Sequence, residues 1–183
     1  MIKRNLEIEF KTQITKEMYD YLVKKFNLEG NVFAQTNHYF DTPNLDLINQ
    51  KLVLRIREKG DNYKLTSKSH SEKGAWETHI FLTYDEAKKM LDEGFNASII
   101  QLDYDVKKVA ELTTYRVTTA YRNGKIFFDK SVYYGNTDYE IEYEADSIEQ
   151  GKKDFAQFLK ENNIPYIPSI SKSKRAYKYK DQK

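Results

Sequence analysis

The first regular feature of the chain is a strict alternation of apolar and charged residues over residues 5–11. One parity is apolar, and the other is charged and consists of Glu7, Glu9 and Lys11. Successive residues of a β-strand point to opposite faces, so this segment is predicted to be a strand with one apolar face and one ionic face. Similar alternation recurs over residues 51–59, 63–68, 75–82 and 138–145.

Other local patterns predict the remaining elements. Further strands are predicted over residues 32–40, 112–122 and 125–133, with hairpin turns at residues 60–62 and at Asn123-Gly124. Helices are predicted where a capping hydroxyl precedes helically spaced apolar residues, beginning after Thr15, Thr83 and Ser147. Residues 95–109 are interpreted as a short helix and a connector. Together these elements predict an α+β fold.

Composition narrows the possible functions. The chain has 183 residues, of which 39% are hydrophobic and 32% charged, with a formal net charge of +2. This balance provides no overall field to attract nucleic acid or an anionic membrane, so neither is an expected partner. The absence of cysteine excludes disulfides and cysteine-bound zinc. No apolar run reaches membrane-spanning length, and the chain is charged from residue 3 onward. We therefore expect a single cytoplasmic domain over residues 1–183.

Charged residues are concentrated on the polar faces of the predicted strands. The acidic positions are Glu7, Glu9, Glu77, Asp129, Glu140, Glu142 and Glu144. The basic positions are Lys11, Arg55, Arg57, Lys64, Lys68, Arg116 and Arg122, with Lys172 and Arg175 from the last part of the chain. Two architectures fit this pattern. In one, a sheet exposes its ionic face to solvent. In the other, about eight antiparallel strands close into a barrel whose ionic faces line the lumen and whose helices lie outside.

The barrel alternative predicts a particular kind of guest. Buried like charges cost free energy unless partners or ions neutralise them, so separate acidic and basic clusters imply a guest with both signs of charge. Carboxylate oxygens are suitable ligands for Mg²⁺ or Mn²⁺. Arginine and lysine are suited to phosphate oxygens. A polyphosphate bound together with its divalent metal satisfies both clusters.

Six segments also form an ordered set of motifs. They are Glu7-Ile8-Glu9-Phe10-Lys11, His38-Tyr39-Phe40-Asp41-Thr42-Pro43, Leu54-Arg55-Ile56-Arg57, Leu65-Thr66-Ser67-Lys68, Glu140-Ile141-Glu142 and Ser171-Lys172-Ser173-Lys174-Arg175. In this order the chain resembles the CYTH superfamily, the triphosphate tunnel metalloenzymes, over nearly its whole length. The strand after Gly74 departs from the family pattern, because His79 stands where a further carboxylate is expected.

The resemblance implies an eight-stranded antiparallel tunnel with flanking helices, in which a triphosphate is bound and, in most members, hydrolysed with a divalent metal. Carried over by position, the metal ligands are Glu7, Glu9, Asp129, Glu140 and Glu142. The phosphate-binding residues, with Lys64 added from the charge pattern, are Lys11, Arg55, Arg57, Lys64, Lys68, Arg116, Arg122, Lys172 and Arg175. Glu7, Glu9 and Lys11 are also the predicted catalytic residues.

Three function classes remain open from the sequence. The favoured one is a Mg²⁺- or Mn²⁺-dependent triphosphatase that acts on inorganic triphosphate, thiamine triphosphate or a nucleoside triphosphate. The alternatives are an adenylate cyclase that makes cAMP from ATP and a module that binds polyphosphate without turnover. All three predict a small-molecule triphosphate or polyphosphate as the partner, and their products distinguish them.

Overall fold

The structure, a computed structural model, describes residues 2–181. Its strands are β1 (Lys3–Ile14), β2 (Phe33–Asp41), β3 (Leu52–Lys59), β4 (Asn62–Ser71), β5 (Gly74–Leu82), β6 (Phe95–Asn96), β7 (Asp105–Tyr121), β8 (Gly124–Tyr133) and β9 (Asn136–Ala145). Its α-helices are α1 (Lys16–Lys25), α2 (Asp46–Asn49), α3 (Tyr84–Glu93), α4 (Ile148–Glu161) and α5 (Lys172–Tyr179). Within these residues, no helix is both long enough and apolar enough to cross a membrane.

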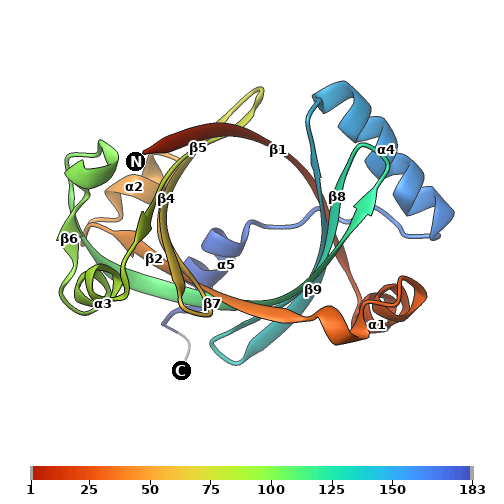
Figure 1. Cartoon of the computed structure of the whole chain (residues 1–183), viewed down its shortest axis with the longest axis horizontal. Coiled ribbons are helices and arrows are strands. Elements are labelled where there is room, and N and C mark those ends of the chain that lie inside the picture. The colour runs from red at the N-terminus through yellow and green to blue at the C-terminus, as the bar shows by residue number, and fades with distance from the viewer. Residues whose placement is uncertain (1, 182–183) are drawn as a thin grey trace.

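The strands close into a barrel. Antiparallel pairs follow the order β2-β3-β4-β5-β1-β9-β8-β7, and β7 pairs back with β2. The short strand β6 adds only a two-residue ladder to β7. Figure 1 looks along the barrel and shows α1, α3 and α4 outside its wall. The predicted α+β fold, a closed eight-stranded antiparallel barrel with external helices, is therefore confirmed.

Local capping explains where the external helices begin. Thr83 and Glu86 form a complete capping box at α3, because each side chain accepts a hydrogen bond from the other's backbone N–H. At α4, Ser147 accepts a hydrogen bond from the backbone N–H of Gln150. The pattern of Ser147 and Gln150 in the sequence also fits a capping box, but the Gln150 amide donates to Asp154 at 2.9 Å, so only half of such a box is formed. All three predicted helices are present.

One segment differs from its sequence-based interpretation. Residues 95–109 were expected to be a short helix and a connector. A short 3₁₀ helix is present at Ala97–Ile100, but β7 already begins at Asp105. The pairing with β2 shifts between Tyr39 and Phe40, which leaves Val109 as an extra residue in β7. Such a bulge reverses the parity of the residues that precede it, and the alternation used to find strands is interrupted there.

The C-terminal segment forms helix α5 instead of a solvated tail, and this helix closes one end of the barrel. Figure 1 shows α5 within the outline of the strands. Its Ala176 is fully buried among side chains that point inward from four strands, namely Tyr39, Val53, Ala110, Leu112 and Tyr133. The hydroxyl of Tyr177 donates a hydrogen bond of 3.2 Å to Asp41, the last residue of β2. Apolar packing and this bond fix α5 against the wall.

Apolar burial lies mainly between the barrel wall and the external helices. The side chains of α1 and α4 pack on the outer faces of β7, β8 and β9, and those of α2 and α3 pack on β3, β4 and β5. Phe158 of α4 is fully buried in the first of these clusters, where its ring lies 5.0 Å from that of Tyr121. The core therefore forms a shell around the barrel, and the lumen is left for charged groups.

The substitution Phe158→Ala is expected to lower the free energy of unfolding by about 3–5 kcal/mol, because it removes a fully buried ring and leaves a cavity. Urea denaturation followed by circular dichroism measures the change. The matched control is Phe81→Ala, whose ring is 65% exposed and which should change the free energy by less than about 1 kcal/mol. Equal effects of the two substitutions would contradict this account of the core.

Candidate active site

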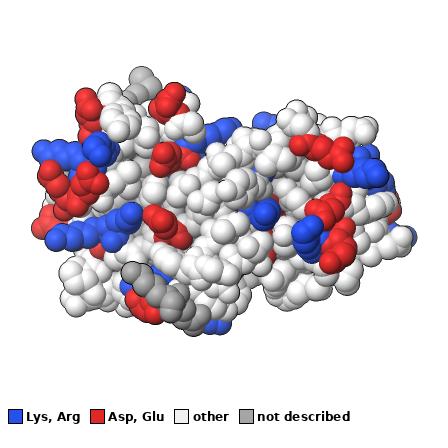
Figure 2. All heavy atoms as spheres, turned by 90° about the horizontal axis from the view of Figure 1, so that it is seen from below, with Lys and Arg blue, Asp and Glu red and all other residues white. Residues whose placement is uncertain are grey.

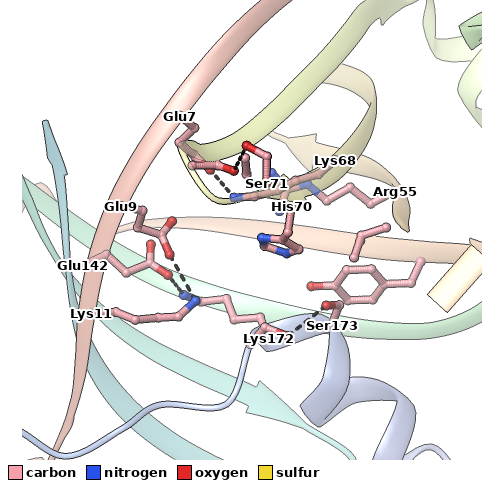
Figure 3. A pocket seen from close by; sticks show the side chains of 15 residues that line it. Glu7, Glu9, Lys11, Arg55, Lys68, His70, Ser71, Glu142, Lys172 and Ser173 are labelled. Atoms are coloured by element: carbon pink, nitrogen blue, oxygen red, sulfur yellow. Dashed lines mark hydrogen bonds and ion pairs between the residues drawn. The ribbon is translucent and has the colours of Figure 1, made fainter. Parts of the chain in front are cut away.

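Charged side chains of both signs gather inside the barrel. On the outer face shown in Figure 2, acidic and basic side chains are interspersed, with uncharged residues between them. Inside, two cavities of about 280 and 490 Å³ both include Glu7 and Arg55 in their walls, and we call the two together the channel. Figure 3 shows Glu7, Glu9, Lys68 and His70 around the first cavity. Of the two architectures that fitted the sequence, the charged lumen is the correct one.

The first acidic cluster consists of Glu7, Glu9 and Glu144. Strands β1 and β9 run side by side in a register that pairs Glu9 with Glu144, and one carboxylate oxygen from each of the three residues lies within 4.8 Å of the others. Glu7 bonds to Lys68, and Glu9 lies 3.1 Å from Lys11. Glu144 has no such partner within residues 2–181, and burial together with Glu7 raises its pKa to about 7.

A cluster of this kind is suited to a divalent cation. Three carboxylates supply hard oxygen ligands, which Mg²⁺ and Mn²⁺ prefer. Burial and the nearby Glu7 raise the pKa of Glu144, and the cluster sets three carboxylates against two lysines, Lys68 and Lys11. A bound divalent ion would supply the missing positive charge, so the donor set of Glu7, Glu9 and Glu144 fits such an ion.

The second acidic cluster consists of Asp129, Glu140 and Glu142, and basic side chains of the protein already neutralise it. The Lys172 ammonium lies 2.8 Å from Asp129 and 2.5 Å from Glu142, and it also bonds to Glu140. Arg116 forms a two-bond fork with Asp129, at 2.7 and 2.6 Å. Although burial opposes the shift, Lys172 and Arg116 hold the pKa of Glu142 well below its usual value.

The remaining basic residues of the channel differ in how well they are paired. Arg55 lies 3.3 Å from Glu77. Within residues 2–181, neither Arg57 nor Lys64 forms an ion pair, and Arg57 donates only to the amide oxygen of Asn37, at 3.0 Å. Burial, followed by the charges of Arg55 and Arg116, lowers the pKa of Arg57 to about 10. Burial and nearby arginines also lower the pKa of Lys64. This part of the channel therefore attracts an anion.

Arg122, a predicted phosphate-binding residue, lies outside the barrel. Its guanidinium lies 3.4 Å from Asp154 and 3.5 Å from Glu161, both on α4 outside the barrel. The strand pattern that grouped it with Arg116 ends at Tyr121, and the hairpin backbone then takes Arg122 to a φ of 50°. The prediction that Arg122 binds phosphate in the lumen is therefore corrected. Its side chain instead connects the β7–β8 hairpin to α4 on the outside of the barrel.

The other predicted site residues point into the barrel, but in a different grouping. Arg175 pairs with Asp138 and Glu140 beside a separate cavity of about 190 Å³. The sequence assigned Glu7 and Glu9 to one metal site together with Glu140 and Glu142, whereas the structure divides them between two clusters. Glu144 completes the first cluster. The charge pattern counted it among the acidic positions, but the ligand set carried over from the family left it out. Its signal was present in the sequence, since it continues the i, i+2 spacing of the other two glutamates in β9.

Comparisons with known proteins show which family the chain resembles. A sequence profile described as "CYTH domain" matches residues 5–177. A Bacillus subtilis (strain 168) protein named "Putative triphosphatase YjbK" is 33% identical over 186 residues, which cover 98% of each chain. A Bacillus halodurans protein, whose crystal structure is named that of a "putative adenylate cyclase", is 32% identical with a TM-score of 0.87, and the match covers 94% of this chain and 97% of that one.

A more distant solved structure shares the fold. A Hippeastrum protein, named a "putative adenylyl cyclase" with "a dominant triphophatase activity", has a TM-score of 0.74 at 20% identity, over 94% of this chain and 95% of that one. The profile match covers nearly the whole chain, and the charged barrel is the structure that the sequence motifs led us to expect. The chain belongs to the CYTH domain family.

Proposed function

We propose that this protein is a divalent-metal-dependent triphosphatase that hydrolyses the terminal phosphoanhydride of a triphosphate inside the barrel. The observation that carries the proposal is the juxtaposition of two uncompensated groups along one channel. Glu7, Glu9 and Glu144 present excess negative charge, and Arg57 and Lys64 present positive charge that no carboxylate of residues 2–181 pairs with. A triphosphate with a divalent ion supplies the opposite charge to each group.

The basic residues of the channel have different roles in binding the triphosphate. Arg57 and Lys64 are free to bind phosphate oxygens, and the planar guanidinium of Arg57 suits two oxygens at once. Arg55 and Lys68 also line the cavity, beside Glu77 and Glu7 respectively. Arg116 is held by Asp129 and Glu142, so it orders the second cluster and adds positive potential to the channel.

Hydrolysis requires charge stabilisation and positioning more than covalent participation by the protein. Water adds to the terminal phosphorus as the anhydride P–O bond breaks, giving orthophosphate and a diphosphate. The positive side chains stabilise charge on the phosphate oxygens as this occurs. When bound, the divalent ion neutralises phosphate charge and activates water. Lys11, 3.1 Å from Glu9, is placed to orient that water or to polarise a phosphate oxygen.

A product assay tests the proposal. The purified protein is incubated with tripolyphosphate, thiamine triphosphate or ATP, each with Mg²⁺ or Mn²⁺ and with EDTA as the control. We expect metal-dependent release of orthophosphate from at least one substrate, and loss of that release with EDTA. Formation of cAMP and pyrophosphate from ATP would favour a cyclase instead. Tight binding of all three compounds without any product would favour a binding module.

A further inference from the structure

Asn37 is a buried polar residue of β2 to which the proposed mechanism gives no role. The sheet register pairs it directly with Arg57 of β3, and it has no exposed surface. Arg57 lines the channel cavity of about 490 Å³, whereas Asn37 lines neither channel cavity. A guest in the channel would therefore contact Arg57 directly and be separated from Asn37.

The contact between these two side chains fixes the direction of the guanidinium. Nε of Arg57 donates a hydrogen bond of 3.0 Å to Oδ1 of Asn37, and no other side-chain hydrogen bond of Arg57 forms within residues 2–181. The guanidinium is planar, and its N–H groups have fixed directions. A bond at Nε therefore determines where the N–H groups of both terminal nitrogens point, and these are the groups that bind phosphate oxygens in the proposed function.

Asn37 holds Arg57 without neutralising its charge. An amide oxygen accepts a hydrogen bond but carries no formal charge. Arg116 shows the other arrangement in the same barrel, because the carboxylates of Asp129 and Glu142 pair with it. The amide of Asn37 therefore leaves the positive charge of Arg57 available to an anion.

The Asn37 amide is unfavourable for folding in one respect. Because Nε of Arg57 is a donor, the amide presents its oxygen to it, and its own nitrogen is turned away. That nitrogen, Nδ2, is buried and has no hydrogen-bond partner within the described chain. A buried donor without a partner destabilises a folded protein. Asn37 is thus better explained by its contact with Arg57 than by a contribution to stability.

We propose that Asn37 is a positioning residue, which directs the guanidinium of Arg57 toward the phosphates through one neutral hydrogen bond. The inference rests on the proposed function of the channel, because that function makes Arg57 a phosphate-binding residue. Asn37 itself does not touch the substrate. Its effect on the reaction passes through Arg57.

A double-mutant cycle of Asn37→Ala and Arg57→Gln tests this inference, with inorganic tripolyphosphate as the substrate. Alone, Asn37→Ala is expected to lower kcat/KM about tenfold to a hundredfold, mostly through kcat, which is the usual effect of misplacing a group by about 1 Å. In the Arg57→Gln background the same substitution should change kcat/KM by less than about twofold, because the residue through which it acts is absent. Equal effects in the two backgrounds would overturn the inference.

The substitution Asn37→Asp separates the position of Arg57 from its charge. Aspartate accepts the same hydrogen bond, so kcat should stay within about threefold of wild type. Its carboxylate also pairs with Arg57, so the association constant of tripolyphosphate from calorimetry should fall about fivefold to thirtyfold. If Asn37→Asp lost as much kcat as Asn37→Ala, or bound tripolyphosphate as tightly as wild type, the role given to Asn37 would be wrong.

The matched control is Gln35→Ala. Gln35 is a second buried amide on the same face of β2, but it lines neither channel cavity and does not bond to Arg57 within residues 2–181. Its removal should leave kcat/KM within about threefold of wild type. A loss as large as that of Asn37→Ala would show that the effect does not depend on the bond to Arg57, and would overturn the inference.

Calorimetry distinguishes a failure of this inference from a failure of the proposed function. The association constant of tripolyphosphate is measured for the wild-type protein and for each variant of the cycle. If Asn37→Ala weakens binding in the wild-type background and not in Arg57→Gln, while the wild-type protein releases no phosphate, the triphosphatase is contradicted and the positioning role of Asn37 is retained.

Discussion

Replacing Glu9 with glutamine is expected to reduce metal-dependent phosphate release by about a hundredfold or more while the barrel stays folded. Glu9 contributes one of the three oxygens that lie within 4.8 Å of one another in the first acidic cluster. A bound metal contributes several kcal/mol to stabilising the transition state, and each 1.4 kcal/mol corresponds to about tenfold in rate. Glutamine keeps the size of the side chain but removes its charge. Phosphate release with increasing Mn²⁺ and calorimetric Mn²⁺ binding measure the loss.

The control for this substitution is Glu149→Gln, an exposed glutamate in the first turn of α4 that pairs only with Lys153. It should leave turnover and metal affinity unchanged. Wild-type turnover by Glu9→Gln would show that the first cluster does not hold the metal.

The affinity of the wild-type protein for Mn²⁺ should also rise from about pH 6 to about pH 8, because Glu144, with a pKa of about 7, loses its proton over this range.

Replacing Arg57 with glutamine is expected to lower kcat/KM for a triphosphate by about thirtyfold to a thousandfold, since a buried charge contact to a ligand contributes about 2–4 kcal/mol. The same substitution should not destabilise the free protein. Arg57 has no carboxylate partner among the described residues, and its lowered pKa, about 10, means that the empty barrel disfavours its charge. The thermal unfolding midpoint should therefore equal or exceed that of wild type below about pH 10.

These opposite effects distinguish a ligand-binding residue from a structural one. The matched control is Arg122→Gln, because Arg122 pairs with Asp154 and Glu161 outside the channel. It should leave kcat/KM within about twofold of wild type and lower the unfolding midpoint slightly, as expected for partly exposed ion pairs. If Arg57→Gln were less stable than wild type with unaltered kinetics, Arg57 would be a structural residue.

The sequence predicted most of the barrel because the alternation of residues is local information. Glu7 and Glu9 in β1 and Arg55 and Arg57 in β3 all take the inward face that their spacing indicated. Thr83 and Glu86 likewise fix the start of α3 through contacts within one turn. Elements whose pattern is contained within a few residues were predicted close to their observed positions.

Long-range contacts explain what the sequence pattern did not show. Five of the eight residues of α5 are lysine, arginine or serine. The helix is held by contacts with distant strands, such as those of Lys172 with Asp129 and of Ala176 with the apolar cluster. The early start of β7 was hidden by the bulge at Val109. The split of the acidic residues into two clusters follows from the register of β1 against β9, which alternation leaves undetermined.

The position of β1 between β5 and β9 has a consequence for how the protein is made. β1 begins at Lys3, but its second neighbour, β9, ends at Ala145. During synthesis, β1 therefore cannot pair with β9 until most of the polypeptide has left the ribosome. We call this pairing of the first and last strands the seam. Glu9 and Glu144 face each other across this seam, so the acidic centre is assembled only after the polypeptide as far as β9 has emerged.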